Sequence, residues 1–360
     1  MAKIWVLGNG QLGAMLKHAA APLGLDVEPV DIDSTTPITL AADDLVTAER
    51  EQWPTTDITT QLANHPNFVN LPVFPTLADR KTQKELLDSL AIATAPWRPV
   101  EASSSADELH AQLGEKVLLK RRSGGYDGRG QHWLHQPLGT VIPDQWHDHA
   151  IAEQAINFDE ELSLVGVRDA GGQMFFYPLT LNLNTNGILR ATVSPVARLQ
   201  GLQAEAEAML GSLLSELNYV GVMGMELFRQ GGQLMVNELA PRVHNTGHWT
   251  QAGASISQFE YHMRAVAGLP LAAPWIKATS VMINLIGSEF NEQWLSVAGA
   301  EVYWYQKAVR PGRKVGHINL SHTEPAKLTA SLQALAGLLE DDYQEPIAWS
   351  LRELNSAAGN

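Results

Sequence analysis

The pattern of hydrophobic and polar positions predicts strands and helices in alternation, as in α/β and α+β proteins. An apolar strand at 3–7 leads through a glycine turn into a helix that extends to about Pro22, and a second strand covers 27–30. Prolines predict a loop around 72–75 and a linker at 91–99, and asparagines predict a polar loop at 182–186. Further strands are predicted at 117–120, 131–134, 150–156, 162–167, 175–178, 281–286 and 302–305, and further helices at 58–63, 80–89, 205–216, 255–267 and 328–338.

Two of these helices carry additional expectations. Asp79 is suited to cap the helix at 80–89, and Lys81 and Lys84 on that helix are expected to face solvent. The helix at 328–338 is expected to be the last one, with the chain frayed after about Ser350.

The stretch 222–249, VMGMELFRQGGQLMVNELAPRVHNTGHW, predicts two short strands joined by a tight turn. If the turn centres on Gly232, Glu226 and Glu238 lie directly opposite each other, because both are equally far from it. Opposed residues have Cβ atoms about 4.5–5.5 Å apart, and like charges placed so destabilise the pair. A magnesium ion would remove that repulsion, and an ordinary hairpin with both carboxylates in water remains the alternative. The other face is expected in the core, with Met223, Met225, Leu227, Met235 and Leu239.

The opening Gly8-Asn9-Gly10-Gln11-Leu12-Gly13 is a literal G-x-G-x-x-G after a strand. Asp31 and Asp33 follow the second strand, roughly where a dinucleotide fold places its ribose-binding acid. The same backbone geometry serves any phosphate at a helix N-terminus. A phosphate or nucleotide ligand is therefore favoured, and a purely structural turn stays open.

A second glycine-rich loop, RRSGGYDGRG at 121–130, joins two predicted strands and follows Lys120. It is not a P-loop, because it lacks G-K-[ST] and no helix follows. Glycine N–H groups approach phosphates closely, and Lys120 supplies a positive charge beside them. The loop is interpreted as a flap over phosphates rather than a plain hairpin loop.

Three other segments carry polar groups that could bind ligands. Glu153 and Gln154 interrupt an apolar strand where backbone groups could meet an adenine edge. The run 240–248 brings a cation and several hydrogen-bond donors near the paired glutamates, with His248 interpreted as packed structure. The run 310–317, RPGRKVGH, predicts a compact basic turn that favours an anion site over a solvated turn.

Composition narrows the class of protein. With 45% hydrophobic and 18% charged residues, the 360-residue chain has a globular composition and length for two or three domains. A net charge of −14 argues against nucleic-acid and anionic-membrane surfaces. No cysteine is present, so disulfides and thiolate chemistry are excluded. The start of the chain does not match a signal peptide and no run reaches a membrane span, so a cytoplasmic enzyme is expected.

Taken together, the lysine strand, glycine flap, nucleotide-edge strand and paired carboxylates resemble the ATP-grasp superfamily. Within it, SGGYDGRGQ (123–131), NELAPRVHNTGHW (237–249) and RPGRKVGH (310–317) resemble the family of 5-(carboxyamino)imidazole ribonucleotide synthetases. The resemblance covers essentially the whole chain, and the first two runs are specific in combination. It implies a Rossmann-like pre-ATP-grasp domain at 1–100, an ATP-grasp domain at 101–270 with a mobile β-flap subdomain at about 110–160, and a small β-rich domain at 271–360.

The resemblance also implies a reaction and a set of site residues. ATP, Mg²⁺ and bicarbonate would carboxylate the amine of 5-aminoimidazole ribonucleotide through carboxyphosphate, in a homodimeric enzyme of purine biosynthesis with no nucleic-acid or membrane partner. Catalytic roles would fall to Tyr126, Asp127, Arg129, Arg242, His244 and Asn245, and metal binding to Glu226 and Glu238. ATP would be bound by Arg80, Lys120, Gly125, Tyr126, Asp127, Gly128, Arg129, Gly130, Gln131, Glu153, Gln154, Ala155, Ile156, Glu161, Asn237 and Glu238. The nucleotide substrate would be bound by Gly10, Gln11, Leu12, Lys307, Arg313 and Lys314.

Two positions depart from the family pattern. Asn184 stands where a histidine is expected near the nucleotide, so it is left out of the site. Thr246 replaces a serine and keeps the hydroxyl. Three alternatives remain open: a sibling ATP-grasp ligase acting on formate or another carboxylate, an NAD-dependent Rossmann oxidoreductase, and a non-catalytic nucleotide sensor.

Overall fold

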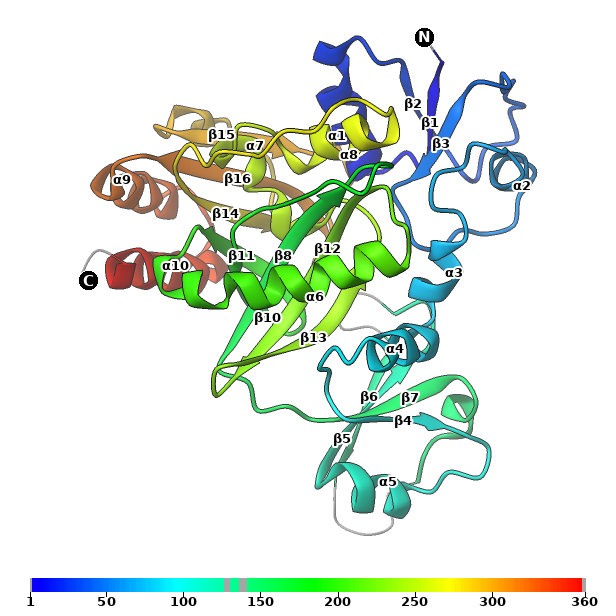
Figure 1. Cartoon of the computed structure of the whole chain (residues 1–360). Helices are drawn as coiled ribbons and strands as arrows, with labels where there is room; N and C mark the ends of the chain where they lie inside the picture. The colour runs from blue at the N-terminus through cyan, green and yellow to red at the C-terminus, as the bar shows by residue number, and fades with distance from the viewer. Residues whose placement is uncertain (1, 126–129, 136–140, 358–360) are drawn as a thin grey trace.

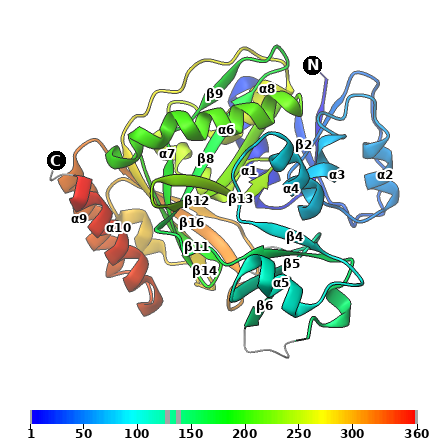
Figure 2. The same cartoon turned by 60° about the horizontal axis from the view of Figure 1, so that its bottom comes forward.

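The computed structural model describes residues 2–125, 130–135 and 141–357 (Figure 1). Within these residues the strands form a parallel three-stranded sheet, an antiparallel four-stranded sheet and a nine-stranded sheet. The three-stranded and four-stranded sheets lie on one side of the large sheet, and the C-terminal helices lie on the other (Figures 1 and 2). The expected mixed α/β and α+β architecture is confirmed.

The N-terminal sheet has the order β2-β1-β3, with all strands parallel. Helix α1 follows β1 directly and packs on this sheet and on α8. The glycine-turn and helix predictions are confirmed here, whereas the third strand was not predicted. The elements are β1 (Ile4–Leu7), α1 (Gln11–Ala20), β2 (Val27–Val30), β3 (Leu45–Ala48) and α2 (Asp57–Ala63).

Two short helices connect this sheet to the four-stranded sheet. The loop expected from Pro72 and Pro75 is wrong, because α3 (Val73–Ala78) forms there. Pro75 lies in the first turn of α3, where a backbone N–H has no partner within the helix and its absence costs little. Helix α4 (Arg80–Ser89) begins as predicted, with the Asp79 side chain accepting a hydrogen bond from the Lys81 N–H.

The four-stranded sheet, called the lid sheet below, has the order β4-β7-β5-β6. Its β5–β6 hairpin carries the glycine-rich loop, as predicted. The linker expected at 91–99 is only partly right, because Trp97 begins an edge strand. Pro99 fits there, since an edge strand needs hydrogen bonds on one side only. The elements are β4 (Trp97–Val100), α5 (Ala106–Leu113), β5 (Lys116–Arg121), β6 (Gln131–His135) and β7 (Ala150–Gln154).

The large sheet runs β13-β12-β8-β10-β11-β14-β16-β15, with β9 beside β8. Side chains that alternate along β14 enter two different cores, Ile283 beneath α6, α9 and α10 and Met282 on the side of α1 and α8. The strands of the expected small C-terminal domain extend this sheet, because β14 pairs with β11. The strands of the large sheet are β8 (Glu160–Arg168), β9 (Met174–Phe176), β10 (Thr180–Thr185), β11 (Ile188–Ser194), β12 (Gly221–Gln230), β13 (Gln233–Ala240), β14 (Thr279–Ile286), β15 (Ala300–Trp304) and β16 (Lys314–His322).

The polar loop predicted at 182–186 is wrong, because most of it belongs to β10. Its asparagines are tolerated in a strand because they find partners: Asn182 lies 3.5 Å from the Ser163 hydroxyl, and Asn184 donates to Glu161. The remaining helices are α6 (Gln203–Glu216), α7 (Thr250–Gly253), α8 (Gln258–Val266), α9 (Pro325–Ala336) and α10 (Gln344–Ala357), and the 3₁₀ turns are η1 (Ala21–Leu23), η2 (Asp144–Trp146), η3 (Ala197–Leu202), η4 (Asn245–Gly247), η5 (Glu292–Ser296) and η6 (Asp341–Tyr343).

A buried histidine joins the N-terminal sheet to the large sheet. The His262 Nδ1 accepts from the Val222 N–H at 3.1 Å, which leaves the proton on Nε2, 3.0 Å from the Thr47 hydroxyl. Burial lowers the pKa of His262 to about 4, so the ring is neutral at pH 7. This contact helps to fix the two sheets on which the candidate site is built.

The end of the chain also differs from expectation. Helix α9 is not the last helix, and residues 351–357 are not frayed, because they belong to α10, which continues to Ala357. Leu354 is buried in the main core, and Glu353 pairs with Arg198 at 2.8 Å. The final turns of α10 are thus part of the folded unit.

This packing predicts that Leu354→Ala lowers the free energy of unfolding by about 2–5 kcal/mol, the usual cost of emptying a buried leucine site. Urea denaturation followed by circular dichroism measures it. Asn355→Ala, at the exposed neighbouring position, is the matched control and should change stability little. Equal stabilities of the two variants would mean that the C-terminal turns are frayed after all.

Candidate functional site

The β12–β13 hairpin places Glu226 directly opposite Glu238, as predicted. The strand register that brings them together differs from the one expected. The turn consists of Gly231 and Gly232, both with positive φ. If the pairing next to the turn continued unchanged along the strands, Glu226 would face Asn237. An irregularity between Glu226 and Leu227 shifts the pairing by one residue, and Asn237 is the extra residue. The carboxylates therefore meet because of a β-bulge.

The same bulge changes which side chains of β13 face the core. Leu234 and Val236 are buried on that face, together with Leu239 beyond the bulge. Met235 was expected there, but it pairs with Phe228 and is only half-buried, so this assignment was wrong. A one-residue shift moves every residue between the turn and the bulge to the opposite face.

The surroundings of the two carboxylates differ in charge. Burial raises the pKa of Glu238, and Glu51 adds to the rise, whereas Arg80, Lys120 and Arg242 oppose it. Glu226 lies 3.7 Å from the Nε2 of His244. A divalent cation between these acids would lower their mutual repulsion and satisfy the hard oxygen ligands that magnesium prefers.

The segment after β13 carries Arg242, His244 and Asn245 beside the acids. Burial, with Arg242 and Lys314 nearby, lowers the pKa of His244 to about 3, so its ring is neutral at pH 7. Its Nδ1 lies 2.9 Å from the Thr246 hydroxyl, which shows that threonine serves at this position. The charge in this segment is therefore supplied by Arg242, which pairs with Glu51 at 2.8 Å.

A glycine allows His244 to pack this closely. A Cβ at Gly224 would lie 2.6 Å from the Cβ of His244, a distance that real side chains do not adopt. The strand that carries Glu226 can thus touch the segment that carries His244 only because it has no side chain at Gly224.

A buried charge cluster faces the hairpin from the lid sheet. Glu153 places one carboxylate oxygen 2.6 Å from the Lys120 ammonium and the other 2.7 Å from the Lys84 ammonium. Lys120 also donates to the Asn237 side chain at 3.3 Å. The expectation that Lys84 faces solvent was wrong, since it is 3% exposed. Lys81 is partly exposed and lies 3.8 Å from Glu85.

The N-terminus of α4 is attached to the glycine-rich loop of the lid sheet. Arg80 donates to the carbonyl oxygens of Arg121 and Gly125, at 3.1 Å each. The Nε–H of Arg122 is shared between the two carboxylate oxygens of Asp79, each 3.0 Å away, and an Nη of Arg122 also donates to Asp79. Of the predicted phosphate-binding flap, Gly125, Gly130 and Gln131 are described, whereas Tyr126, Asp127, Gly128 and Arg129 lie outside the described residues.

On the expected nucleoside side, Glu161 lies near the β7–β8 connection. Burial raises the pKa of Glu161, and a hydrogen bond from Asn184 opposes the rise. The Asn184 amide is 2.8 Å from this carboxylate, so the position left out of the prediction does contact a predicted site residue. The backbone N–H groups of Gln154 and Ala155 bond to other carbonyls, while the side chain of Gln154 is exposed.

The opening glycine turn already holds an anion from its own chain. The Glu49 carboxylate, at the end of β3, accepts hydrogen bonds of 2.5 Å from the N–H groups of Gly10 and Gly13. Lys307 donates to the side chain of Gln11, which brings the C-terminal strands to this turn. Two of the turn's N–H groups, those of Gly10 and Gly13, are therefore satisfied by a carboxylate.

The basic turn is shorter than expected, because β16 begins at Lys314. His317 is consequently in a strand, fully buried between Tyr305 and Gln251. Arg313 remains partly exposed and donates to the Ala308 carbonyl oxygen at 3.1 Å. His248 is fully buried and stacks near His317, which agrees with its interpretation as packed structure.

Sequence reasoning missed three of these residues, Lys84, Glu49 and Glu51. Lys84 follows Arg80 by four residues, a spacing that places both on one face of α4, and this signal was available. The two glutamates follow β3, a strand that was not predicted, so their proximity to the site could not be inferred.

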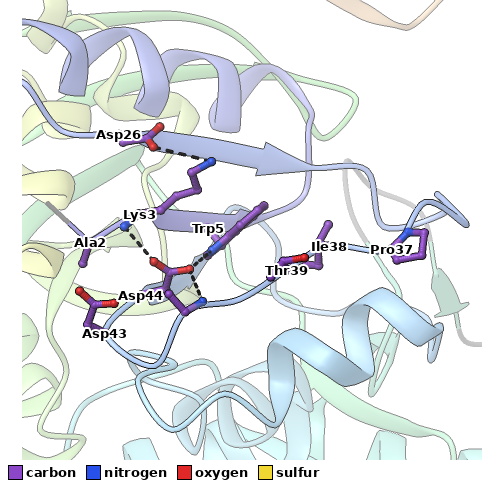
Figure 3. A pocket seen from close by; sticks show the side chains of 10 residues that line it. Ala2, Lys3, Trp5, Asp26, Pro37, Ile38, Thr39, Asp43 and Asp44 are labelled. Atoms are coloured by element: carbon purple, nitrogen blue, oxygen red, sulfur yellow. Dashed lines mark hydrogen bonds and ion pairs between the residues drawn. The ribbon is translucent and has the colours of Figure 1, made fainter.

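A cavity of about 590 Å³ lies away from this site. Figure 3 shows it at the start of β1, where Asp44 accepts hydrogen bonds from the Trp5 indole and from the backbone of Lys3 and Ala41. Ligands of parallel α/β sheets bind at the carboxyl ends of the strands, which is the opposite edge. In the described part of the chain, no group of three or more His, Asp or Glu could hold a metal, and no helix is long and apolar enough to cross a membrane.

Three family models match consecutive parts of the chain. Residues 1–71 match the ribonucleotide synthetase preATP-grasp domain, residues 85–259 the ATP-grasp domain, and residues 280–331 the phosphoribosylaminoimidazole carboxylase C-terminal domain. The chain is 50% identical to the N5-carboxyaminoimidazole ribonucleotide synthase of Escherichia coli, over 97% of this chain and 99% of that protein. It is 49% identical to that of Haemophilus influenzae, over 98% and 97%.

Solved structures agree with these matches. The N5-carboxyaminoimidazole ribonucleotide synthetase of Thermus thermophilus is 36% identical, with a TM-score of 0.82 over 94% of this chain and 99% of that one. An Aspergillus clavatus synthase in complex with ADP and 5-aminoimidazole ribonucleotide is 25% identical, with a TM-score of 0.78 over 93% and 98%.

The opposed carboxylates predict that Glu238→Gln stabilises the protein in EDTA by about 0.2–1 kcal/mol, because it removes a like charge from a cross-strand pair. Magnesium should raise the unfolding midpoint of the unsubstituted protein and leave that of the variant nearly unchanged. Urea unfolding with and without Mg²⁺ measures both effects, with exposed Glu216→Gln as the control. An equal response of all three proteins to magnesium would contradict a metal site at Glu238.

Proposed function

The chain belongs to the family of N5-carboxyaminoimidazole ribonucleotide synthases, and on this basis we propose that it uses ATP and bicarbonate to carboxylate 5-aminoimidazole ribonucleotide in purine biosynthesis. The products are N5-carboxyaminoimidazole ribonucleotide, ADP and phosphate. The observation that carries the proposal is the full-length match to these enzymes together with a carboxylate pair that faces a buried cluster of ammonium groups.

The first step transfers the γ-phosphoryl group. A bicarbonate oxygen forms a bond to the γ-phosphorus, the bond to the ADP oxygen breaks, and carboxyphosphate results. The protein contributes position and positive charge to such a transfer rather than covalent chemistry. Lys120 and Arg80 supply the charge, and the described flap residues Gly125, Gly130 and Gln131 bring backbone groups to the phosphates.

The second step forms the carbon–nitrogen bond. The substrate amine attacks the carbon of carboxyphosphate and the bond from that carbon to the phosphate oxygen breaks, or carboxyphosphate first loses phosphate and the amine attacks the resulting carbon dioxide. In both routes the nitrogen loses one proton, which the released phosphate takes up. Arg242 binds the anion, and Asn245 offers a side-chain oxygen that has no hydrogen-bond partner among the described residues. His244 is neutral at pH 7, so it serves as a hydrogen-bonding group rather than as a second cation.

The carboxylate pair fits a magnesium ion. Glu226 and Glu238 would hold it, and their opposition across the hairpin supplies the oxygen ligands that the ion prefers. When bound, magnesium neutralises charge on the phosphate oxygens.

The two nucleotides occupy different ends of the site in this proposal. Adenine and ribose of ATP lie along 153–156, with Glu161 and Asn237 beside them. The phosphate of the imidazole nucleotide binds Arg313 and Lys314, with Lys307 next to Gly10, Gln11 and Leu12. Within the turn, Glu49 already accepts from the N–H groups of Gly10 and Gly13, so these two N–H groups are not expected to bind that phosphate.

The remaining parts of the proposal rest on the family resemblance. The resemblance gives Tyr126, Asp127, Gly128 and Arg129, which lie outside the described residues, roles in ATP binding and catalysis; the flap is proposed to exclude water, since carboxyphosphate decomposes in water. The enzyme forms a homodimer and acts in the cytoplasm. It has no nucleic-acid or membrane partner, in keeping with its net charge of −14.

The reaction is tested by measuring ADP formation with each component omitted in turn. We expect full activity only with ATP, Mg²⁺, bicarbonate and 5-aminoimidazole ribonucleotide together, and loss of activity in EDTA. Formate in place of bicarbonate should not support ADP formation. Activity with formate, or with neither acid, would assign the chain to a different reaction.

The proposed substrate contacts predict that Arg313→Ala with Lys314→Ala raises the KM for the imidazole nucleotide at least tenfold, with little change in the KM for ATP. Each charge-assisted hydrogen bond contributes about 1.5–3 kcal/mol, and one lost bond of this kind accounts for the tenfold change. Steady-state kinetics measure both constants, with exposed Arg310→Ala in the same turn as the control. A parallel rise in both KM values would indicate a damaged fold instead.

A further inference from the structure

Lys84 is a buried lysine for which the proposed reaction has no direct use. It extends from α4 to Glu153 on β7, and their side chains are only 4% and 5% exposed. Burying an ammonium group is costly unless a partner compensates for lost hydration. The burial of Lys84 therefore needs an explanation in terms of the charges around it.

The net charge of Lys84, Lys120 and Glu153 provides an explanation for this burial. One carboxylate, Glu153, lies between two ammonium groups, Lys84 and Lys120, so these three groups together carry +1. Burial lowers the pKa of Lys84, and Glu153 and the nearby Asp88 oppose that decrease. Although burial alone would raise it, the two lysines lower the pKa of Glu153 to about 2, so the carboxylate is ionised. A buried cluster with one excess positive charge suits an anion such as a phosphate group.

The two lysines bind different oxygens of the Glu153 carboxylate. Lys84 takes one oxygen at 2.7 Å, and Lys120 takes the other at 2.6 Å while also reaching Asn237 at 3.3 Å. If Lys84 were uncharged, both oxygens would attract Lys120 alone. Its ammonium group would then be held toward Glu153 and away from Asn237 and the adjoining Glu238.

The position of α4 supports a role in alignment. Its first residues hold the glycine-rich loop, through Arg80 to the Gly125 carbonyl oxygen and through Asp79 to Arg122. Lys84, one turn further on, holds β7 of the same lid sheet. Figures 1 and 2 both show α4 lying against this sheet. The helix thus contacts the lid sheet at the loop and at the strand that carry the predicted ATP-binding groups.

We infer that Lys84 is a positioning residue for phosphoryl transfer, which occupies one oxygen of Glu153 so that Lys120 is aimed at the phosphates of ATP. This inference rests on the proposed function. It concerns the ATP side of the reaction and makes no contribution to binding of the imidazole nucleotide.

Lys84→Met tests the inference, because methionine keeps most of the length and removes the charge. We expect kcat to fall by about 100-fold, the order of loss that follows a displacement of about 1 Å in a reacting group. The KM for ATP should rise, and the KM for the imidazole nucleotide should stay within twofold. Lys81→Met, on the exposed side of the same helix, is the matched control and should keep the kinetics of the unsubstituted enzyme.

A chemical rescue separates positioning from packing. The chain has no cysteine, so Lys84→Cys creates a unique thiol. Alkylation in urea with 2-bromoethylamine, followed by refolding, restores an ammonium group at nearly the original distance, whereas iodoacetamide adds a neutral group. The aminoethylated protein should recover most of the lost kcat and the neutral adduct should not.

Three outcomes would overturn the inference. They are unchanged kcat and ATP KM in Lys84→Met, equal recovery with both alkylating agents, and a loss explained fully by a smaller folded fraction. Calorimetric titration with ADP keeps the two proposals distinct, because it reads the nucleotide site without turnover. If the unsubstituted chain binds ADP but forms none with bicarbonate, the proposed function fails, and weaker ADP binding by Lys84→Met than by Lys81→Met would still support the positioning role.

Discussion

Two acidic side chains held face to face across an antiparallel pair are the constraint on which the rest of the site depends. Such an arrangement is unfavourable in isolation, because like charges repel and burial raises the pKa of Glu238. The protein surrounds it with Arg80, Lys120 and Arg242, and Lys120 is in turn fixed by Glu153. Lys120 belongs to the lid sheet, Arg80 to α4 and Arg242 to the segment after β13, so the site is complete only where the lid sheet and α4 meet the hairpin.

Much of the fold could be predicted from local signals. The glycine turn, the capped helix at Asp79 and the flap hairpin all have sequence patterns that act over a few residues. Predictions failed where a tertiary partner outweighs local preference. Asn182 and Asn184 suggest a loop, yet they form a strand because Ser163 and Glu161 satisfy their amides.

The site shows the same division. The pairing of Glu226 with Glu238 could be predicted, because both are equally far from Gly232. The observed register, however, depends on a β-bulge at Asn237, for which the sequence has no local signal. The spacing of Lys84 from Arg80 was visible, but its burial depends on Glu153, which is distant in the sequence. Likewise, the glycine turn has the pattern of a phosphate site, and only the fold reveals that Glu49 fills it.

The continuity of the large sheet has a mechanical consequence. The carboxylate hairpin β12–β13 and the basic end of β16 belong to one hydrogen-bonded array, in which strands keep their spacing unless ladders of bonds break. The separation between the phosphoryl-transfer end and the acceptor end is therefore stiff. The four-stranded sheet lies outside this array and joins it through 91–96 and 155–159, so the residues that cover the intermediate and those that align the acceptor belong to different parts of the chain.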